Sequence, residues 1–146
     1  MIIVSHYSQL PTDSMNWSWP NFTPKEMADR VDGALVIDPR FMDRLQALRT
    51  KLGFPFSLSS AYRTPEHDRH IGGAGVHPQG CAVDIRVAGQ RAYVLLQAAM
   101  EVEFSGIGIS QRGSYNGRFI HLDDLENTYD QATNTGHPRP RIWSYG

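Results

Sequence analysis

Residues 59–86 read SSAYRTPEHDRHIGGAGVHPQGCAVDIR, and this stretch decides the fold that the sequence predicts. His77 and Asp84 stand seven residues apart in it, and residues 82–87, which carry Asp84, have the composition of a β-strand. A loop histidine and a strand aspartate at this spacing can converge on one point. Imidazole nitrogen and carboxylate oxygen are both good Zn²⁺ ligands, and a catalytic zinc site typically has three protein ligands and a fourth position for water. His77 and Asp84 are therefore candidates for two of three metal ligands.

His121 is the candidate for the third ligand. It lies in the apolar run of residues 118–122, which predicts a strand able to lie beside residues 82–87. Alternate residues of a strand share a face, so Asp84 is expected to face a cleft, and His121 to share its face with Asp123. Taken singly, the three candidates have ordinary interpretations: a loop histidine, a hydrogen-bonded strand histidine and a carboxylate paired with a neighbouring arginine.

Three blocks match a known pattern in order and at suitable spacing: Ser60-Ala61-Tyr62-Arg63-Thr64, then Val76-His77-Pro78-Gln79-Gly80-Cys81-Ala82-Val83-Asp84, then His121. The pattern is a Ser-Gly-Tyr-Arg-Ser-like segment, then Ser-x-His-x-x-Gly-x-Ala-x-Asp, then a late His on a strand. From about Asn21 to Trp143 the chain resembles the zinc D-Ala-D-Ala carboxypeptidase and L-alanyl-D-glutamate endopeptidase family, which shares its fold with the hedgehog signalling domain. Val76 replaces the usual Ser, which removes a hydroxyl and leaves the ligand positions unchanged.

The resemblance implies a fold, a cofactor and a substrate. The fold is α+β, with a small antiparallel sheet, helices packed on one face and the metal on the other. One Zn²⁺ per chain would be held by His77, Asp84 and His121. The substrate would be a peptidoglycan stem peptide or cross-bridge containing D-amino acids, hydrolysed by metal-activated water. A compact chain of this kind resembles the phage or prophage members of the family.

The general base is the point at which the chain departs from the relatives. Several of them place Glu, Asp or His two or three residues before the last zinc histidine, where this chain has Phe119 and Arg118. Asp123, which shares a strand face with His121, is the substitute candidate for the catalytic base. The alternative is that Asp123 only orients His121 or has a structural role. Asp124 is expected to point away.

Arg63 and Tyr62 are predicted to bind the substrate. In the carboxypeptidase relatives the arginine that matches Arg63 holds a substrate carboxylate, and a guanidinium suits that bidentate contact. The ordinary alternative is a salt bridge from Arg63 to Glu66 or Asp68.

Two other functions are compatible with these residues. The first is a D-Ala-D-Ala carboxypeptidase that trims the stem peptide, which an exposed Arg63 closing one end of the cleft would favour. The second is a catalytically silent metal-binding domain or phage structural component, which the missing acid before His121 favours.

Composition excludes several classes of partner. The net charge of −1 gives no electrostatic case for nucleic acid, whose binding needs a positive patch, and no run approaches the ~20 apolar residues of a membrane span, so neither nucleic-acid binding nor membrane insertion is expected. The 146 residues predict one domain, expected to be a monomer, and the single Cys81 cannot form an internal disulfide. The N-terminus lacks the features of a signal peptide. We therefore expect synthesis in the cytoplasm and action on the bacterial cell wall, after lysis or from a virion.

Local patterns predict the elements. Residues 1–20 are expected to be an irregular arm, and residues 126–146 an irregular tail anchored by Trp143 and Tyr145. His67 and His70 are expected to lie in a polar loop, residues 72–75 to form a flexible entry to His77, and Cys81 to be a small buried side chain. Helices are predicted over residues 24–30, 39–52 and 90–101, and strands over residues 56–59, 82–87, 106–109 and 118–122.

Overall fold

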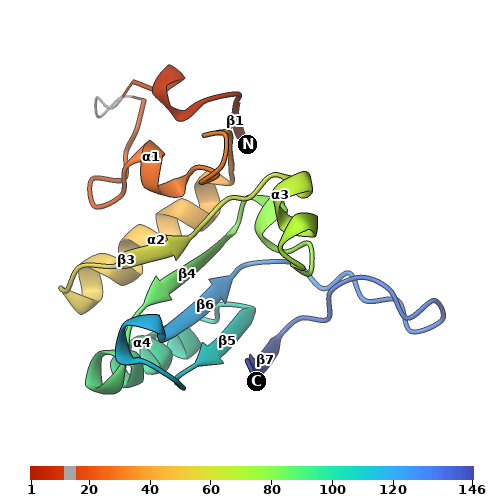
Figure 1. The fold of residues 1–146 in the computed structure, drawn as a ribbon. Coiled ribbons are helices and arrows are strands. Elements are labelled where there is room, and N and C mark those ends of the chain that lie inside the picture. Colours follow the sequence, from red (N-terminus) through yellow and green to blue (C-terminus); the bar gives the residue numbers. More distant parts are fainter. Residues whose placement is uncertain (12–15) are drawn as a thin grey trace.

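The computed structural model describes residues 1–11 and 16–146, which form helices and strands in mixed order (Figure 1). The strands are β1 (Ile2–Val4), β2 (Leu35–Ile37), β3 (Ser57–Ser60), β4 (Ala82–Arg86), β5 (Gly106–Ser110), β6 (Phe119–Asp123) and β7 (Arg141–Ser144). The α-helices are α1 (Pro24–Met27), α2 (Pro39–Leu52), α3 (Pro65–His70) and α4 (Gly89–Glu101). Short 3-10 helices span Tyr7–Gln9 (η1), His77–Gln79 (η2) and Tyr115–Gly117 (η3).

Five strands form one sheet in the order β3-β4-β6-β5-β7, and β1 pairs with β2 in a separate sheet. Neighbours in the large sheet are antiparallel except β5 and β7, which run parallel. His121 on β6 lies opposite Asp84 on β4 on one side and opposite Gly108 on β5 on the other. The antiparallel centre of the sheet is confirmed, whereas β7 corrects the prediction that residues 126–146 are irregular throughout.

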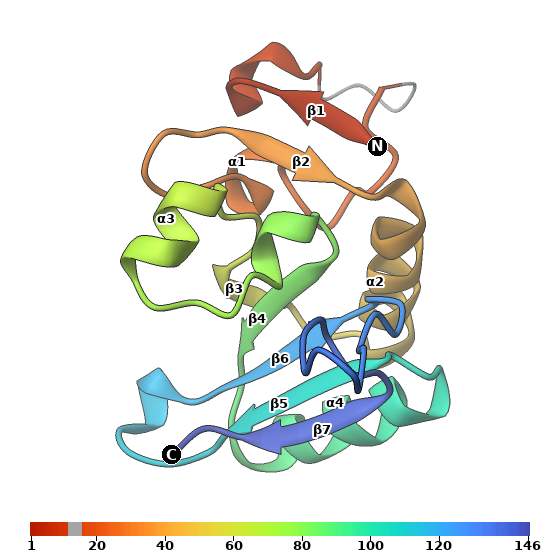
Figure 2. The same ribbon diagram turned by 90° about the vertical axis from the view of Figure 1, so that its right-hand side faces the viewer.

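Helices α2 and α4 cover one face of the large sheet (Figure 2). Leu45 of α2, Leu95 of α4 and Ile120 of β6 are at most 1% exposed and belong to the same core cluster. Burial of such side chains is the main stabilising contribution to the fold. Asp84 and His121 meet on the opposite face. The predicted α+β fold, with helices on one face of a sheet and the polar cluster on the other, is confirmed.

Helix α2 begins and ends where the sequence predicts. The Asp38 side chain accepts a hydrogen bond from the amide of Arg40, and Pro39 occupies the first helical position. The helix ends at Gly53, whose φ of 76° is left-handed and suits a glycine.

Helix α1 has the predicted capping box between Thr23 and Glu26 but ends at Met27 instead of continuing to Arg30. Ala28 is already extended. The carboxylate of the following Asp29 accepts the amide of Val31, which forms a turn in place of a further helical turn.

Helix α3 corrects the prediction that His67 and His70 lie in a polar loop. The Thr64 hydroxyl accepts the amide of His67 and Pro65 takes the first helical position, which is the pattern that begins α1. The Thr-Pro signal was therefore present in the sequence.

The N-terminal arm is more ordered than predicted. Residues Ile2–Val4 pair with Leu35–Ile37, because two β-branched, apolar runs can satisfy each other's backbone groups. Trp17 and Trp19 are each 5% exposed and belong to the core. Residues 12–15 of the predicted arm lie outside the described residues.

No helix within the described ranges is long and apolar enough to cross a membrane.

Candidate metal centre

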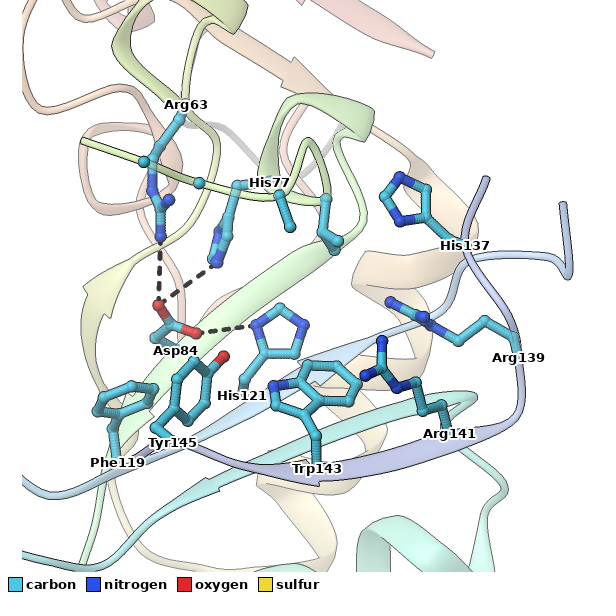
Figure 3. A pocket seen from close by; sticks show the side chains of 14 residues that line it. Arg63, His77, Asp84, Phe119, His121, His137, Arg139, Arg141, Trp143 and Tyr145 are labelled. Carbon is cyan, nitrogen blue, oxygen red and sulfur yellow. Dashed lines mark hydrogen bonds and ion pairs between the residues drawn. The ribbon is translucent and has the colours of Figure 1, made fainter. Parts of the chain in front are cut away.

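Three side chains from three separate elements converge in the cavity on the open face of the sheet (Figure 3). His77 begins η2, Asp84 lies in the middle of β4 and His121 in the middle of β6, and one ligand atom from each lies within 4.8 Å of the others. Gly80 follows η2 with a φ of 79°, and a Cβ there would lie 2.8 Å from the carbonyl oxygen of Val36. Only glycine fits this return from η2 to β4, which places His77 beside Asp84.

His77 is oriented by the backbone. Its Nδ1 lies 2.6 Å from the carbonyl oxygen of Ala61, and a carbonyl only accepts, so Nδ1 carries the proton and donates. The lone pair of the neutral ring is then on Nε2, which lies 3.4 Å from Oδ2 of Asp84. His77 is 5% exposed. Its geometry suits a metal ligand that binds through Nε2.

His121 lies between two carboxylates. Its Nδ1 is 2.9 Å from Oδ1 of Asp84, and its Nε2 is 2.7 Å from Oδ2 of Asp123. Burial lowers the pKa of His121, but the hydrogen bonds with Asp123 and Asp84 outweigh burial, so its pKa lies above the ordinary value of an imidazole. Because Nδ1 faces the other two ligands, a metal ion would be bound there and Asp123 would hold the opposite nitrogen.

Asp84 is ionised in this arrangement. Burial raises the pKa of its carboxyl, but the hydrogen bonds with His121 and His77 lower it further than burial raises it, and the pKa lies below the usual range. The carboxylate is therefore ready to ligate a cation without first losing a proton.

Asp123 is fully buried, and both its oxygens are engaged. Arg139 Nε donates to Oδ1 at 2.9 Å and Arg139 Nη2 donates to Oδ2 at 2.8 Å. Burial raises the pKa of Asp123, but the hydrogen bonds with His121 and Arg139 lower it to about 2. Gly106 makes room for this pair, because a Cβ there would lie 2.2 Å from the Asp123 carboxylate. Asp123 lies behind His121 and is not among the residues that line the cavity.

Asp124 points away and pairs with Arg44.

Arg63 lines the cavity and also forms the salt bridge that was its alternative. Its Nη1 lies 2.8 Å from Oδ1 of Asp68, its Nη2 lies 3.5 Å from Oδ2 of Asp84, and its side chain is 14% exposed. Asp68 is itself buried and accepts the amide of Gly75. Tyr62, the other predicted substrate contact, is 8% exposed and lies in the core, outside the cavity lining.

The cavity has a volume of about 400 Å³, and sequence reasoning missed most of one wall. That wall comes from the C-terminal segment, residues 124–146, and its side chains in the cavity are His137, Arg139, Arg141, Trp143 and Tyr145. Trp143 and Tyr145 were predicted only as anchors. The alternation of large and charged residues at odd positions from 137 to 145 was a signal for a strand with one face on a site.

Strand β5 provides the space for this wall. Trp143 lies opposite Gly108 in the parallel β5–β7 register. A Cβ at Gly108 would lie 2.6 Å from the indole nitrogen of Trp143. Strand β5 alternates glycine with isoleucine, so its isoleucines face the core side and its glycines admit the side chains of the wall.

His67, His70 and Cys81 lie outside the cavity lining. His67 is hydrogen-bonded through Nδ1 to Oδ2 of Asp29 at 2.8 Å, and His70 is on the exposed side of α3. Cys81 is buried as predicted, and burial raises the pKa of its thiol to about 12, which keeps it protonated and unreactive.

The region that carries the candidate ligands matches a known protein family. The family model described as Peptidase M15 matches residues 20–123, which include all three candidate ligands and end at Asp123. The comparison with curated proteins found no matching sequence. The wall formed by residues 124–146 lies outside the match.

Proposed function

Because the chain belongs to the peptidase M15 family, we propose that it is a zinc-dependent peptidase that hydrolyses stem-peptide or cross-bridge bonds of peptidoglycan. The observation that carries the proposal is the convergence of His77, Asp84 and His121 on one point of the cavity. A bacterial cell wall as the site of action and a phage or prophage origin are parts of the same proposal, supported by the resemblance of the sequence blocks.

The donor set fits zinc. Two imidazoles and one carboxylate are typical of a catalytic zinc site, and zinc bonds of about 2.0–2.1 Å in a tetrahedron would separate ligand atoms by about 3.4 Å. Oδ1 of Asp84 lies 2.9 Å from His121 Nδ1, Oδ2 of Asp84 lies 3.4 Å from His77 Nε2, and one ligand atom from each of the three residues lies within 4.8 Å of the others. Bound zinc would polarise a scissile carbonyl and lower the pKa of a water toward ~7.

Asp123 is proposed to act through His121 and not directly on the substrate or water. It is 0% exposed, its oxygens accept from Arg139 and His121, and a group of that kind fixes the ring orientation of a metal ligand. Of the two roles predicted for Asp123, this burial supports the orienting role. Its carboxylate, with a pKa of about 2, remains ionised throughout the physiological range.

Arg63 is proposed to bind a carboxylate of the peptide. Asp68 forms a salt bridge with its Nη1. The guanidinium lies at one end of the triad of His77, Asp84 and His121, beside Asp84 (Figure 3). This position favours a bond close to a carboxylate, as in a D-Ala-D-Ala carboxypeptidase, which is the second candidate function.

A catalytically silent metal-binding domain is the third candidate. Among the described residues that line the cavity, Asp84 is the only carboxylate, and it is a proposed ligand.

The deciding experiment is to measure the metal content of the purified protein and its digestion of purified peptidoglycan with and without chelator, with released fragments identified by mass. One zinc per chain with chelator-sensitive release supports the peptidase, and the fragment masses name the bond. One zinc without release, on walls of several chemotypes, supports the silent domain. Absence of bound metal after zinc reconstitution contradicts all three candidates.

A further inference from the structure

The cavity carries more positive charge than the triad and Arg63 require. Its lining includes the three guanidinium groups of Arg63, Arg139 and Arg141, but only one carboxylate, that of Asp84. Two of these guanidiniums form salt bridges with carboxylates outside the cavity lining, Arg63 with Asp68 and Arg139 with Asp123. Arg141 forms no ion pair with any described residue.

Arg141 is exposed, but its backbone and its guanidinium both have contacts. It lies on β7, which is hydrogen-bonded to β5, and its guanidinium carbon lies 5.5 Å from the centroid of the Trp143 ring. The Trp143 ring is in turn fixed over Gly108 and lies 5.1 Å, centroid to centroid, from the ring of His121. A guanidinium stacked on an aromatic ring loses little freedom when it binds an anion, and its in-plane donors remain available.

The charges lie on both sides of the triad. In Figure 3, Arg63 lies to one side of His77 and Asp84, and His137 and Arg141 lie beyond His121 on the other. A Cβ on Gly75 would lie 3.9 Å from His137 Nε2. The C-terminal wall therefore approaches the glycine-rich loop of residues 72–75 at the end of the cavity that His137 lines. A cationic group in a partly enclosed cleft favours an anionic partner.

We propose that Arg141 and His137 form a second anion subsite, which binds a carboxylate of the peptide on the side of the triad opposite Arg63. The inference rests on the proposed function and adds a specificity to it: the preferred substrate carries two carboxylates, one on each side of the metal centre. Arg141 makes the bidentate contact, and His137 donates a hydrogen bond from the same wall.

The test uses the zinc-loaded full chain and four synthetic peptides. The parent is L-Ala-γ-D-Glu-meso-diaminopimelyl-D-Ala-D-Ala, and each of the other three replaces one free carboxylate, on D-Glu, on diaminopimelate or at the C-terminus, with a carboxamide. Binding is followed by the fluorescence change on rapid mixing, and hydrolysis by kcat and KM. The variants are Arg141→Gln, Arg141→Lys and, as a control with the same charge change, Arg40→Gln, whose side chain is 86% exposed on α2.

We expect one carboxamide to weaken binding to the wild type by about tenfold or more, as for loss of a charge-assisted hydrogen bond. Arg141→Gln should bind that carboxamide and the parent equally, with KM affected more than kcat. Arg141→Lys should keep part of the preference, and Arg40→Gln should keep all of it. The carboxylate that depends on Arg141 should differ from the one that depends on Arg63, identified with Arg63→Lys.

Other outcomes overturn the inference. If Arg141→Gln weakens the binding of all four peptides by the same factor, or weakens the binding of none, Arg141 does not bind a carboxylate of the peptide. Equal or undetectable binding of the acid and amide forms by the wild type has the same consequence, even if hydrolysis is normal. If the binding preference is present but no peptide is hydrolysed, the subsite stands and the proposed peptidase activity fails.

Discussion

The centre of the large sheet and the C-terminal segment contribute to the same cavity in different ways. The centre supplies the three candidate ligands from η2, β4 and β6, inside the region that matches the family. The segment of residues 124–146 supplies the opposite wall, outside that match. The proposals above assign the two regions different roles: the sheet centre would hold the metal, and the C-terminal wall would select the substrate. The two regions are joined through Asp123, which contacts His121 on one side and Arg139 on the other.

The largest expected effect comes from removing a ligand at the sheet centre. His77→Ala, Asp84→Ala and His121→Ala should each lose stoichiometric zinc, and activity should fall by more than the 10- to 100-fold typical of outer partners of a metal site. Metal analysis and wall digestion should change together. Arg141→Gln is the contrasting variant, since it should retain zinc. Full activity in any alanine variant would remove that residue from the metal centre.

The second prediction breaks the link between the two regions. Asp123→Ala leaves the buried Arg139 without its carboxylate, and an unpaired buried charge costs about 3–5 kcal/mol of unfolding free energy. It should also weaken zinc binding by about 10- to 100-fold, because His121 loses its orienting partner. Urea unfolding and competition with a chelator measure the two effects. Asp123→Asn, which keeps a hydrogen-bond acceptor, should recover part of the zinc affinity with an unchanged pH profile of kcat. A loss of turnover with normal zinc affinity would instead identify Asp123 as the base.

The lowered pKa of Asp123 predicts how the unfolding free energy of the metal-free protein depends on acid pH. The pKa of Asp123 is lowered from 3.8 to about 2, so its contribution to stability is present above pH ~4 and is lost as the pH falls toward 2. A shift of this size corresponds to about 2 kcal/mol. Unfolding free energies measured between pH 5 and pH 2 should fall more steeply for the wild type than for Asp123→Asn. Parallel curves would show that the pair contributes nothing in this range.

The contribution of His121 to stability has the opposite pH dependence. Its pKa is raised, so its contribution in the metal-free protein is complete below the ordinary imidazole pKa and is lost as the pH rises through its higher value in the folded state. Bound zinc would replace the proton on Nδ1, and this loss should disappear in the zinc-loaded protein.

Two glycines on β5 distinguish the two regions further. Gly106→Ala would place a Cβ against the Asp123 carboxylate and Gly108→Ala would place one against Trp143. Overpacking of this kind costs roughly 1–3 kcal/mol. Gly106→Ala should lower zinc affinity, whereas Gly108→Ala should alter peptide selectivity with zinc affinity retained. Gly117→Ala is the matched control, because a Cβ at Gly117 would lie 3.4 Å from its nearest contact, the Ser114 hydroxyl oxygen. Identical effects of Gly106→Ala and Gly108→Ala on zinc affinity would argue against different roles for the two regions.

The sheet centre could be predicted from the sequence because its signals are local. The cap and period of α2, the alternation of β4 and β6 and the block from Val76 to Asp84 each depend on neighbouring residues. The β4–β6 register then places Asp84 opposite His121. The wall could not be predicted in the same way. Its position depends on a parallel pairing at the sheet edge and on the contact between Arg139 and Asp123, which are remote in sequence. Asp123 lies between Ala82 of β4 and Gly106 of β5, and Arg139 contacts both its oxygens, so its environment depends on the sheet and on the C-terminal segment together.

The smallest expected effect concerns α3, a helix that local signals could have predicted. Thr64→Ala removes the hydroxyl that accepts the amide of His67 and should cost about 1 kcal/mol, the same as Thr23→Ala at the cap of α1. The two variants should differ in function, because α3 carries Asp68, which holds Arg63 beside the triad. We expect Thr64→Ala to raise KM by a few-fold and Thr23→Ala to leave it unchanged, with Thr64→Ser restoring the wild-type value. Equal KM values for both alanine variants would show that the cap of α3 stabilises the helix without influencing Arg63, and would confine substrate binding to the sheet and the C-terminal wall.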